Sequence, residues 1–354
     1  MEKVSNPFSL MYGKRPKQTI ERMNDMNTVI DAFTSDDPSK MTYLITGLRG
    51  TGKTVLLREL AEKFESMDDW LVIDINPQSN ILQSFSDKLD FLFKKYKFPF
   101  DWTLTLNLTT LSVSLCKGKE TIRNPELIAE KYVEKAASKN MKILITIDEV
   151  SKTNDFKLFV NFYQSMIGKN YPVFMIMTGI RSNIDQLISD SAMTFLSRSP
   201  KLEIGPLNNR DIVFEYRSIF NIDLDTATEL ALLTKGYAFA YQVLGYLFFE
   251  KKEKVIDEKL LALYDKYLAD NGYNTFWKEL TSAEKTFCIA LAESETQEVE
   301  DVRKRSNMNI SNFNNYRARL LRKEIIVAKS YGYLEFTLPR FKEFVENKSE
   351  RTKN

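Results

Sequence analysis

One eight-residue stretch constrains the fold of this chain more than any other. It consists of Gly47, Leu48, Arg49, Gly50, Thr51, Gly52, Lys53 and Thr54. The stretch fits the pattern G-x-x-x-x-G-K-[ST], in which small residues let backbone N–H groups wrap a polyphosphate. In that pattern the lysine neutralises the terminal phosphates and the hydroxyl binds Mg²⁺. We therefore expect this phosphate loop, with Val55 directly behind it, to bind the phosphates of a nucleotide.

The residues on both sides of the phosphate loop have the pattern that the loop requires. Residues 41–46 form a short apolar run typical of a buried strand, and the apolar positions of residues 55–64 recur as in an amphipathic helix. A strand, a loop and a helix in this order aim the helix N-terminus at the phosphates. The alternative is a glycine-rich turn that binds no ligand, and the flanking strand and helix argue against it.

Composition excludes several kinds of chemistry. The chain has 354 residues, too many for one ordinary core, with 43% apolar residues and a net charge of +2. It contains no histidine, so catalysis must rest on carboxylates, lysine, arginine and hydroxyls. Cys116 and Cys288 lack metal or redox spacing and are expected to be buried thiols. We find neither a signal pattern nor an apolar run that could cross a bilayer, so we expect a cytoplasmic protein with no membrane contact.

The first part of the chain alternates predicted strands and helices. After the strand before the phosphate loop, further strands are expected over 70–75, 141–147, 171–179 and 201–205, and helices over 18–33, 80–96, 125–138 and 155–167. This alternation indicates an α/β fold with a parallel sheet covered on both faces, a three-layer core. Residues 103–115 alternate apolar and polar side chains and predict a half-exposed hairpin inserted at its edge.

The rest of the chain is predicted to be mainly helical. Helices over 208–220, 225–233 and 238–253 suggest a compact helical lid. Helices over 282–293, 298–305 and 311–323, followed by a hairpin over 325–338, have the order of a winged helix. We therefore predict three domains: an α/β core with an N-terminal leader (1–205), the lid (206–272) and a C-terminal winged helix (273–354).

Two acids follow the strand predicted over 141–147. A nucleotide triphosphatase needs a carboxylate at a strand end near the phosphate loop, to hold Mg²⁺ together with Thr54. Asp148 is expected to be that metal ligand, while Glu149 is expected to orient and deprotonate the attacking water. An ordinary surface acid or helix cap is the alternative, and the pairing with the phosphate loop argues against it.

These motifs together resemble AAA+ ATPases, and most closely the branch that contains the origin-recognition-type ATPases and the signal-transducing STAND ATPases. The phosphate loop, the box Ile143 to Glu149, the polar strand end at Thr178, the segment 196–198, the lid and the winged helix occur in that family's order, over nearly the whole chain. The resemblance implies an ATPase that binds ATP and Mg²⁺, with Lys53 holding the β and γ oxygens.

The resemblance also implies roles for two further residues. Thr178 matches a position where a hydroxyl touches the γ-phosphate or its attacking water; the alternative is a threonine that caps a strand. Arg198 matches the place of an arginine finger, which reaches a neighbour's nucleotide in a homo-oligomer; the alternative is a surface arginine.

The leader and the lid raise further expectations. Phe8 or Tyr12 is expected to lie against the nucleotide base, with simple packing of the leader on the sheet as the alternative. Arg22 resembles an arginine of the family's nucleotide-binding box. The family places a sensor-2 arginine or a proline in the lid, but residues 236–242 contain neither. Slow hydrolysis is therefore expected. Gln242 is either a replacement contact or a helix-surface glutamine.

The helix predicted over 311–323 has a face of amides and cations. At 100° per residue this face carries Asn312, Asn315, Arg319, Arg322 and Lys323. Amides and cations on a helix suit the bases and phosphates of double-stranded DNA. Acids at Glu295, Glu298, Glu300 and Asp301 weaken the basic footprint. The alternative function is therefore a nucleotide-gated switch whose winged helix binds a protein partner, with hydrolysis incidental.

Overall fold

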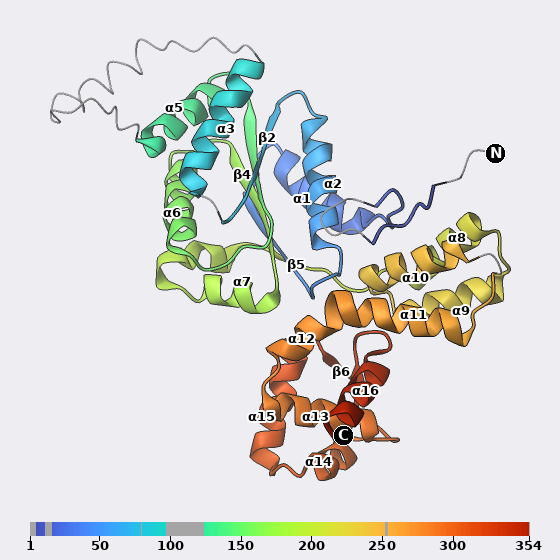
Figure 1. Cartoon of the computed structure of the whole chain (residues 1–354). Helices are drawn as coiled ribbons and strands as arrows, with labels where there is room; N and C mark the ends of the chain where they lie inside the picture. The colour runs from blue at the N-terminus through green and yellow to red at the C-terminus, as the bar shows by residue number, and fades with distance from the viewer. Residues whose placement is uncertain (1–4, 11–15, 79, 97–123, 252–253, 354) are drawn as a thin grey trace, which may run out of the picture. The chain divides into compact units, whose positions relative to one another are not determined.

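The computed structural model describes residues 5–10, 16–78, 80–96, 124–251 and 254–353. Its contacts divide the chain into two compact units (Figure 1). We call Arg22–Thr46 with Lys53–Glu203 the sheet unit, and Met1–Glu21 with Gly47–Gly52 and Ile204–Asn354 the lid unit. The hairpin expected over 103–115, and Cys116, lie outside the described residues. The three-domain division at 205 and 272 stays a prediction.

The sheet unit contains five parallel strands in the order β2-β3-β4-β1-β5. They are β1 (Thr42–Thr46), β2 (Trp70–Ile75), β3 (Lys142–Ile147), β4 (Val173–Gly179) and β5 (Lys201–Glu203). Every residue of β1 and β4 is buried, as expected of strands covered on both faces. Thr46 pairs with Gly179, and Ile147 pairs with Met177. The carboxyl ends of β1, β3 and β4 therefore meet at one edge, and the strands predicted from the sequence are confirmed.

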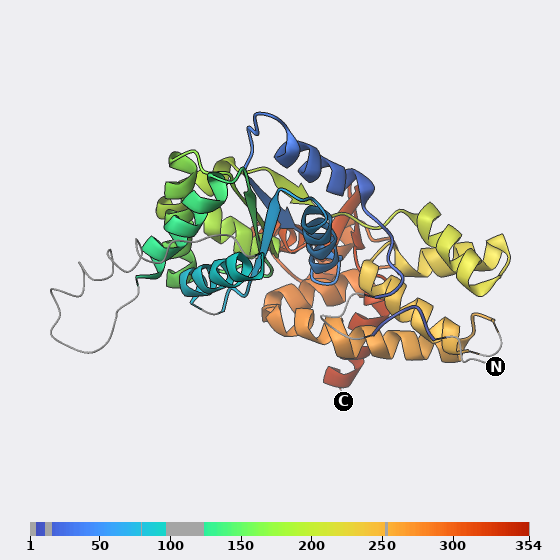
Figure 2. The ribbon, with the colours of Figure 1, turned by 90° about the horizontal axis from the view of Figure 1, so that it is seen from above.

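Helices cover both faces of this sheet, as Figures 1 and 2 show from two directions. They are α1 (Met23–Thr34), α2 (Lys53–Glu65), α3 (Ile81–Lys95), α5 (Pro125–Ala137), α6 (Asn154–Gly168), α7 (Arg181–Ile188) and the 3-10 helix η1 (Ser191–Arg198). On one face Phe33 and Phe64, of α1 and α2, contact Phe174 and Trp70 of the sheet. On the other face α3 packs on α6 through Phe85 and Phe159. The three-layer α/β core is thus confirmed.

The first helices of the lid unit are α8 (Asn209–Phe220), α9 (Leu224–Thr234), α10 (Ala238–Glu250), α11 (Glu258–Leu268), the π-helical turn η2 (Ala269–Tyr273) and α12 (Asn274–Glu279). The first three agree with the predicted lid helices. Aromatic side chains dominate their core: the rings of Tyr216 and Tyr241 stack 5.0 Å apart.

The leader packs into this lid core. The Phe8 side chain is 3% exposed, and its ring lies 5.5 Å from Tyr241 and 5.7 Å from Phe220. Gly245 makes room for it, because a Cβ there would lie 2.5 Å from the Phe8 ring. The predicted contact of Phe8 with a nucleotide base is therefore corrected, because the buried ring is held by lid aromatics. The alternative, packing on the sheet, does not describe Phe8 either, and Tyr12 lies outside the described residues.

The C-terminal part of the lid unit has three helices, a hairpin and a final helix. These are α13 (Ser282–Glu293), α14 (Val299–Ser306), α15 (Ile310–Arg322), β6 (Ile326–Ser330), β7 (Tyr333–Phe336) and α16 (Phe341–Lys353). The order of the first five elements is the predicted one, and α16 was not anticipated. Phe287 and Phe313 stack 4.7 Å apart between α13 and α15. Burial of Cys288 raises its pKa to about 12, as expected of an inert thiol.

No helix within the described ranges is long and apolar enough to span a membrane.

Candidate functional site

Three polar side chains, joined by the backbone N–H of a fourth residue, meet where β3 and β4 end in the sheet unit. The Thr54 hydroxyl, in the first turn of α2, donates a hydrogen bond to Asp148 Oδ2 at 2.7 Å. The Thr178 hydroxyl, on β4, donates to the other oxygen, Asp148 Oδ1. Both oxygens of Asp148 therefore accept hydroxyl hydrogen bonds, from two elements far apart in the sequence. We call Thr54, Asp148, Glu149 and Thr178 the acid cluster.

Thr178 also fixes the backbone of Glu149. The side chain of Thr178 is completely buried, and its oxygen accepts a hydrogen bond from the Glu149 N–H at 3.1 Å. The Thr178 carbonyl accepts from the Val150 N–H at 2.8 Å. Glu149 has φ of 55°, a left-handed conformation that costs an L-residue energy and often marks functional sites. The Glu149 backbone is thus held in a strained conformation, from which the side chain extends into an exposed position.

The acid cluster fits Mg²⁺. Mg²⁺ prefers oxygen ligands and is bound in proteins through one or two carboxylates together with substrate phosphates and water. The Thr54 hydroxyl and an Asp148 carboxylate oxygen lie side by side at 2.7 Å. Among the described residues no group of three or more acids or cysteines could hold a metal alone. The donor set therefore suits a metal that arrives with a polyphosphate.

The phosphate loop has the backbone conformation that its glycines allow. Gly50 and Gly52 have φ of 81° and 97°, in the left-handed region that disfavours other residues. The Thr51 side chain donates to the Leu48 carbonyl at 2.8 Å, which closes the loop on itself. Lys53 begins α2 and its side chain is buried. The predicted strand, loop and helix are all present.

The lid contributes contacts to this loop that were missed from the sequence. The Tyr237 hydroxyl donates to the Arg49 carbonyl at 2.6 Å, and the Phe239 N–H donates to the Gly50 carbonyl at 3.0 Å. Both residues stand in the segment where the sequence lacks a sensor-2 arginine. The only sequence signal was that segment's Gly236, which allows a tight turn.

Gln242 and Arg22 serve structural contacts. The Gln242 side chain accepts from the Ser9 N–H at 3.1 Å and donates to the Gln18 carbonyl at 2.7 Å. It is therefore neither a surface glutamine nor aimed at a phosphate, but holds the leader on α10.

Arg22 precedes α1, and its guanidinium lies 3.9 Å from the Asp25 carboxylate. Burial lowers the pKa of Arg22, against the opposing effect of Asp25 and Glu59.

Arg198 ends η1 and its side chain is exposed. None of the described residues forms an ion pair with it. This exposure is compatible with a finger that acts on another copy of the chain, and also with a surface arginine, so the finger stays a prediction.

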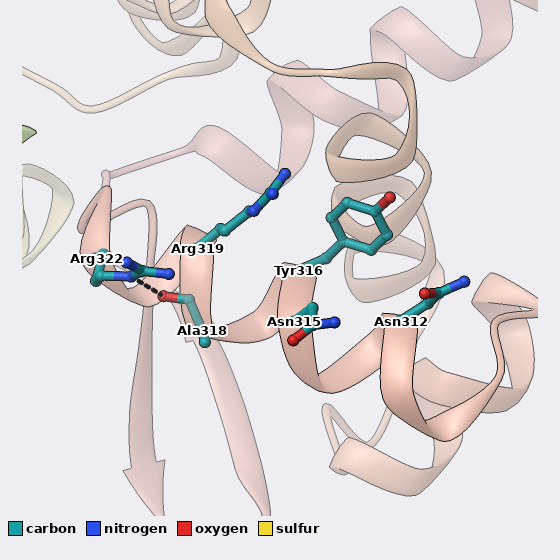
Figure 3. A pocket seen from close by; sticks show the side chains of 6 residues that line it. All are labelled: Asn312, Asn315, Tyr316, Ala318, Arg319 and Arg322. Carbon is teal, nitrogen blue, oxygen red and sulfur yellow. Dashed lines mark hydrogen bonds between the residues drawn. The ribbon is translucent and has the colours of Figure 1, made fainter.

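The exposed face of α15 carries an open hollow of about 310 Å³ (Figure 3). Its lining residues are Asn312, Asn315, Tyr316, Ala318, Arg319 and Arg322. The Arg319 guanidinium lies 5.7 Å from the centre of the Tyr316 ring. Four predicted DNA-contacting residues thus share the hollow. Tyr316, which was not among the predicted residues, lines it too.

Lys323 departs from the predicted face. Its ammonium lies 2.9 Å from the Glu284 carboxylate, which is 1% exposed and also accepts from the Thr281 N–H in a capping box at the start of α13. The assignment of Lys323 to DNA is therefore corrected, because its charge neutralises a buried acid.

Two of the acids near α15, Glu300 and Asp301, pair with arginines of their own helix, α14. Glu300 accepts two hydrogen bonds from the Arg303 guanidinium, and Asp301 accepts from Arg305. Glu298 accepts from the Tyr333 hydroxyl at 3.0 Å. Glu300 and Asp301 therefore oppose a basic surface on α15 less than the sequence suggested, whereas the Glu298 partner is uncharged and Glu295 is exposed.

Comparisons with known proteins agree with this geometry. Residues 39–213 match the family model described as AAA domain, and residues 270–345 match a domain of unknown function. No protein of curated function matches the chain.

Similar folds occur among solved structures. The Walker-type ATPase of Pyrococcus abyssi superposes with a TM-score of 0.66 at 13% identity, covering 96% of this chain and 99% of the other. The ORC2 protein of Aeropyrum pernix, in ADPNP and ADP complexes, gives 0.60 at 12% identity, covering 95% and 96%. A STAND protein with a tetratricopeptide repeat sensor from Pyrococcus horikoshii gives 0.42 at 19%, covering 94% of this chain and 43% of the other.

A parallel sheet of this order, a phosphate loop after β1 and an acid pair after β3 define a P-loop nucleotide-binding fold. Residues 39–213 are an AAA domain. The chain as a whole has a fold similar to those of the Walker-type ATPase and the ORC2 protein.

Proposed function

We propose that this protein binds ATP with Mg²⁺ at the phosphate loop, hydrolyses it slowly, and couples nucleotide state to DNA binding by the winged helix formed by α13, α14, α15 and the β6-β7 hairpin. The observation that carries the catalytic part is the acid cluster, in which hydroxyls from Thr54 and Thr178 hold Asp148. The AAA family match supports it.

Each residue has a distinct task in this proposal. The loop N–H groups and Lys53 bind the β and γ oxygens, as in other phosphate loops. Thr54 and Asp148 hold Mg²⁺, which when bound neutralises negative charge on the phosphates. Glu149 orients the attacking water and accepts its proton. Thr178 keeps Asp148 and the Glu149 backbone in place through its two hydrogen bonds.

Slow hydrolysis is supported by what the lid lacks. Arginine side chains stabilise charge that develops on the transferred phosphoryl group, and their absence lowers turnover by orders of magnitude. The lid segment 236–242 contains no arginine, and its Gln242 is bonded to the leader. A second subunit bringing Arg198 would then be required for faster turnover.

DNA binding is supported by the hollow on α15. Arg319 and Arg322 offer charge for phosphates, while Asn312 and Asn315 offer amides for base edges. Tyr331, fully exposed in the turn between β6 and β7, and Lys329 on β6 belong to the adjoining hairpin. This combination matches a helix in the major groove with a hairpin beside it.

The DNA part is tested by duplex binding at several salt concentrations, measured by fluorescence anisotropy on ATP-loaded protein. Each lost phosphate contact is expected to lower the slope of log affinity against log salt by about one. Arg319→Ala and Arg322→Ala should each show this loss. Arg303→Ala is the matched control, because that guanidinium is bonded to Glu300 on α14.

Failure of ATP-loaded wild-type protein to bind duplex at low salt would refute the DNA part. The winged helix would then be assigned to a protein partner, with the nucleotide acting as a gate.

A further inference from the structure

The turn between α9 and α10 contacts the phosphate loop on one side and the C-terminal hairpin on the other. Towards the loop, the Tyr237 hydroxyl and the Phe239 N–H bind the carbonyls of Arg49 and Gly50, at 2.6 and 3.0 Å. The approach is close: a Cβ at Gly50 would lie 2.3 Å from the Tyr237 oxygen. All of these residues belong to the lid unit.

The second side of the turn reaches β7. The Lys235 ammonium donates to the Glu335 carboxylate at 2.8 Å and to the Phe336 carbonyl at 3.0 Å. Hydrogen bonding from Lys235 lowers the pKa of Glu335, with a further contribution from Lys329. The turn therefore binds the hairpin through two hydrogen bonds from the Lys235 ammonium, one to a carboxylate and one to a backbone carbonyl.

The turn itself is tightly constrained. Lys235 and Gly236 have φ of 48° and 71°, both left-handed. The Gly236 carbonyl accepts from the Leu207 N–H at 2.7 Å, and a Cβ at Gly236 would lie 2.6 Å from the Leu207 carbonyl oxygen. The Tyr237 N–H donates to the Thr234 carbonyl at 2.9 Å. A displacement of the Tyr237 backbone is therefore expected to displace Lys235 as well.

We propose that Tyr237 is a positioning residue for the phosphate loop, and that Lys235–Phe239 transmits the loop's nucleotide state to the β6-β7 hairpin. A sensor-2 arginine would contact the phosphate directly. This lid instead contacts the backbone carbonyls of the loop that wraps the phosphate. The inference rests on the proposed nucleotide binding, and it deepens that function by naming the connection between the nucleotide and the hairpin.

The test combines nucleotide affinity with hydrogen exchange of the full-length protein. Amide exchange over 326–336 is followed by mass spectrometry with and without a non-hydrolysed ATP analogue. Tyr237→Phe removes one hydroxyl, and Lys235→Met removes the charge on the hairpin side. Tyr246→Phe is the matched control. Tyr246 is a partly buried tyrosine of α10, the helix that begins directly after Tyr237, and no loop contact is present for it among the described residues.

In wild-type protein the analogue is expected to change hairpin exchange at least about threefold, as typical coupling energies allow. Tyr237→Phe should weaken analogue binding roughly three- to tenfold, the loss of one hydrogen bond, and remove most of the hairpin response. Lys235→Met should remove the same response with an affinity change of less than about threefold. Tyr246→Phe should behave as wild type. Melting temperatures identify any variant that fails to fold. If Tyr237→Phe fails to fold, the test rests on Lys235→Met, because the Lys235 side chain is partly exposed.

Two results would overturn the inference alone: an analogue that binds wild-type protein without changing hairpin exchange, or an equal response in Lys235→Met, Tyr237→Phe and wild type. Folded wild-type protein that binds no analogue would instead refute the proposed function, and this inference with it.

Discussion

Thr178 and Asp148, thirty positions apart in the sequence, share a hydrogen bond at the carboxyl edge of the sheet. The same hydroxyl oxygen accepts the N–H of Glu149. One buried threonine on β4 thus fixes the side chain of one acid and the backbone of the next. This relationship indicates that Thr178 acts first on the acids; its contact with a γ-phosphate stays a prediction.

Loss of the Thr178 hydroxyl should impair hydrolysis more than nucleotide binding. Residues that orient metal ligands typically contribute 10- to 100-fold to activity or metal affinity. Thr178→Val should therefore lower kcat roughly 10- to 100-fold, and Thr178→Ser should retain most of it. Steady-state phosphate release measures kcat, and titration with a fluorescent ATP analogue measures affinity.

The control for that experiment is Thr146→Val on the neighbouring strand β3. Thr146 is also buried, and its hydroxyl donates to Asp74, on β2, at 3.1 Å. A loss of kcat in Thr146→Val equal to that in Thr178→Val would point to general disturbance of the sheet and not to positioning of the acids.

The left-handed backbone of Glu149 is expected to lower the free energy of unfolding of the protein, at a residue that serves its function. This conformation costs an L-residue about 1–2 kcal/mol, and a β-branched residue tolerates it least. Glu149→Gly should therefore leave the free energy of unfolding unchanged or raised, whereas Glu149→Val should lower it by about 1–2 kcal/mol. Urea denaturation gives both values. Equal stability of the glycine and valine variants would show that the backbone relaxes without strain.

Arg198 is expected to act between subunits. Addition of a slowly hydrolysed ATP analogue should shift the protein to a larger, oligomeric species in sizing chromatography. Arg198→Ala should lower kcat without weakening analogue binding to the monomer. Mixing Arg198→Ala with Lys53→Ala should then restore part of the activity, because each variant supplies what the other lacks. A protein that stays monomeric with the analogue rules out this role for Arg198 under those conditions.

The ion pair of Lys323 and Glu284 predicts a pH-dependent stability. Burial alone raises the pKa of Glu284, but hydrogen bonds from Lys323 and Thr281 outweigh it and lower the pKa below its ordinary value. A lowered carboxyl pKa stabilises the folded protein above the unfolded pKa, about 4.3, and this stabilisation is lost as pH falls through the lowered value.

Lys323→Met should therefore destabilise the protein at pH 7 by roughly 1–3 kcal/mol, because a buried acid loses its partner. The difference from wild type should shrink below about pH 4, and duplex affinity should change less than in Arg319→Ala. Urea midpoints at the two pH values provide the comparison. A constant difference at both pH values would contradict the assignment to Glu284.

The sheet was predictable because its strands are short, continuous apolar runs between polar ends. The phosphate loop and the acids after β3 were predictable for a related reason: the motif requires them at the carboxyl ends of parallel strands. Helix α11 was missed although Leu260, Tyr264 and Leu268 recur at helical spacing behind the cap residue Asp257. The site at the strand ends thus follows from local patterns.

The contacts that local patterns do not reveal join distant positions. Tyr237 and Arg49 are 188 residues apart, and Lys235 and Glu335 are 100 apart. Lys323 was assigned to the wrong surface because a helical wheel continues past Arg322, where α15 ends, and has no information about the buried Glu284 of another helix. Such contacts depend on tertiary packing.

In the proposed mechanism Glu149 activates water against an ATP bound at the phosphate loop. Comparing ATP turnover and analogue affinity of Glu149→Gln with wild type tests it most directly. A general base contributes about 10²- to 10⁴-fold, so turnover should fall by at least about 100-fold while analogue affinity stays within about threefold. Wild-type turnover in Glu149→Gln, at unchanged affinity, would contradict the claim.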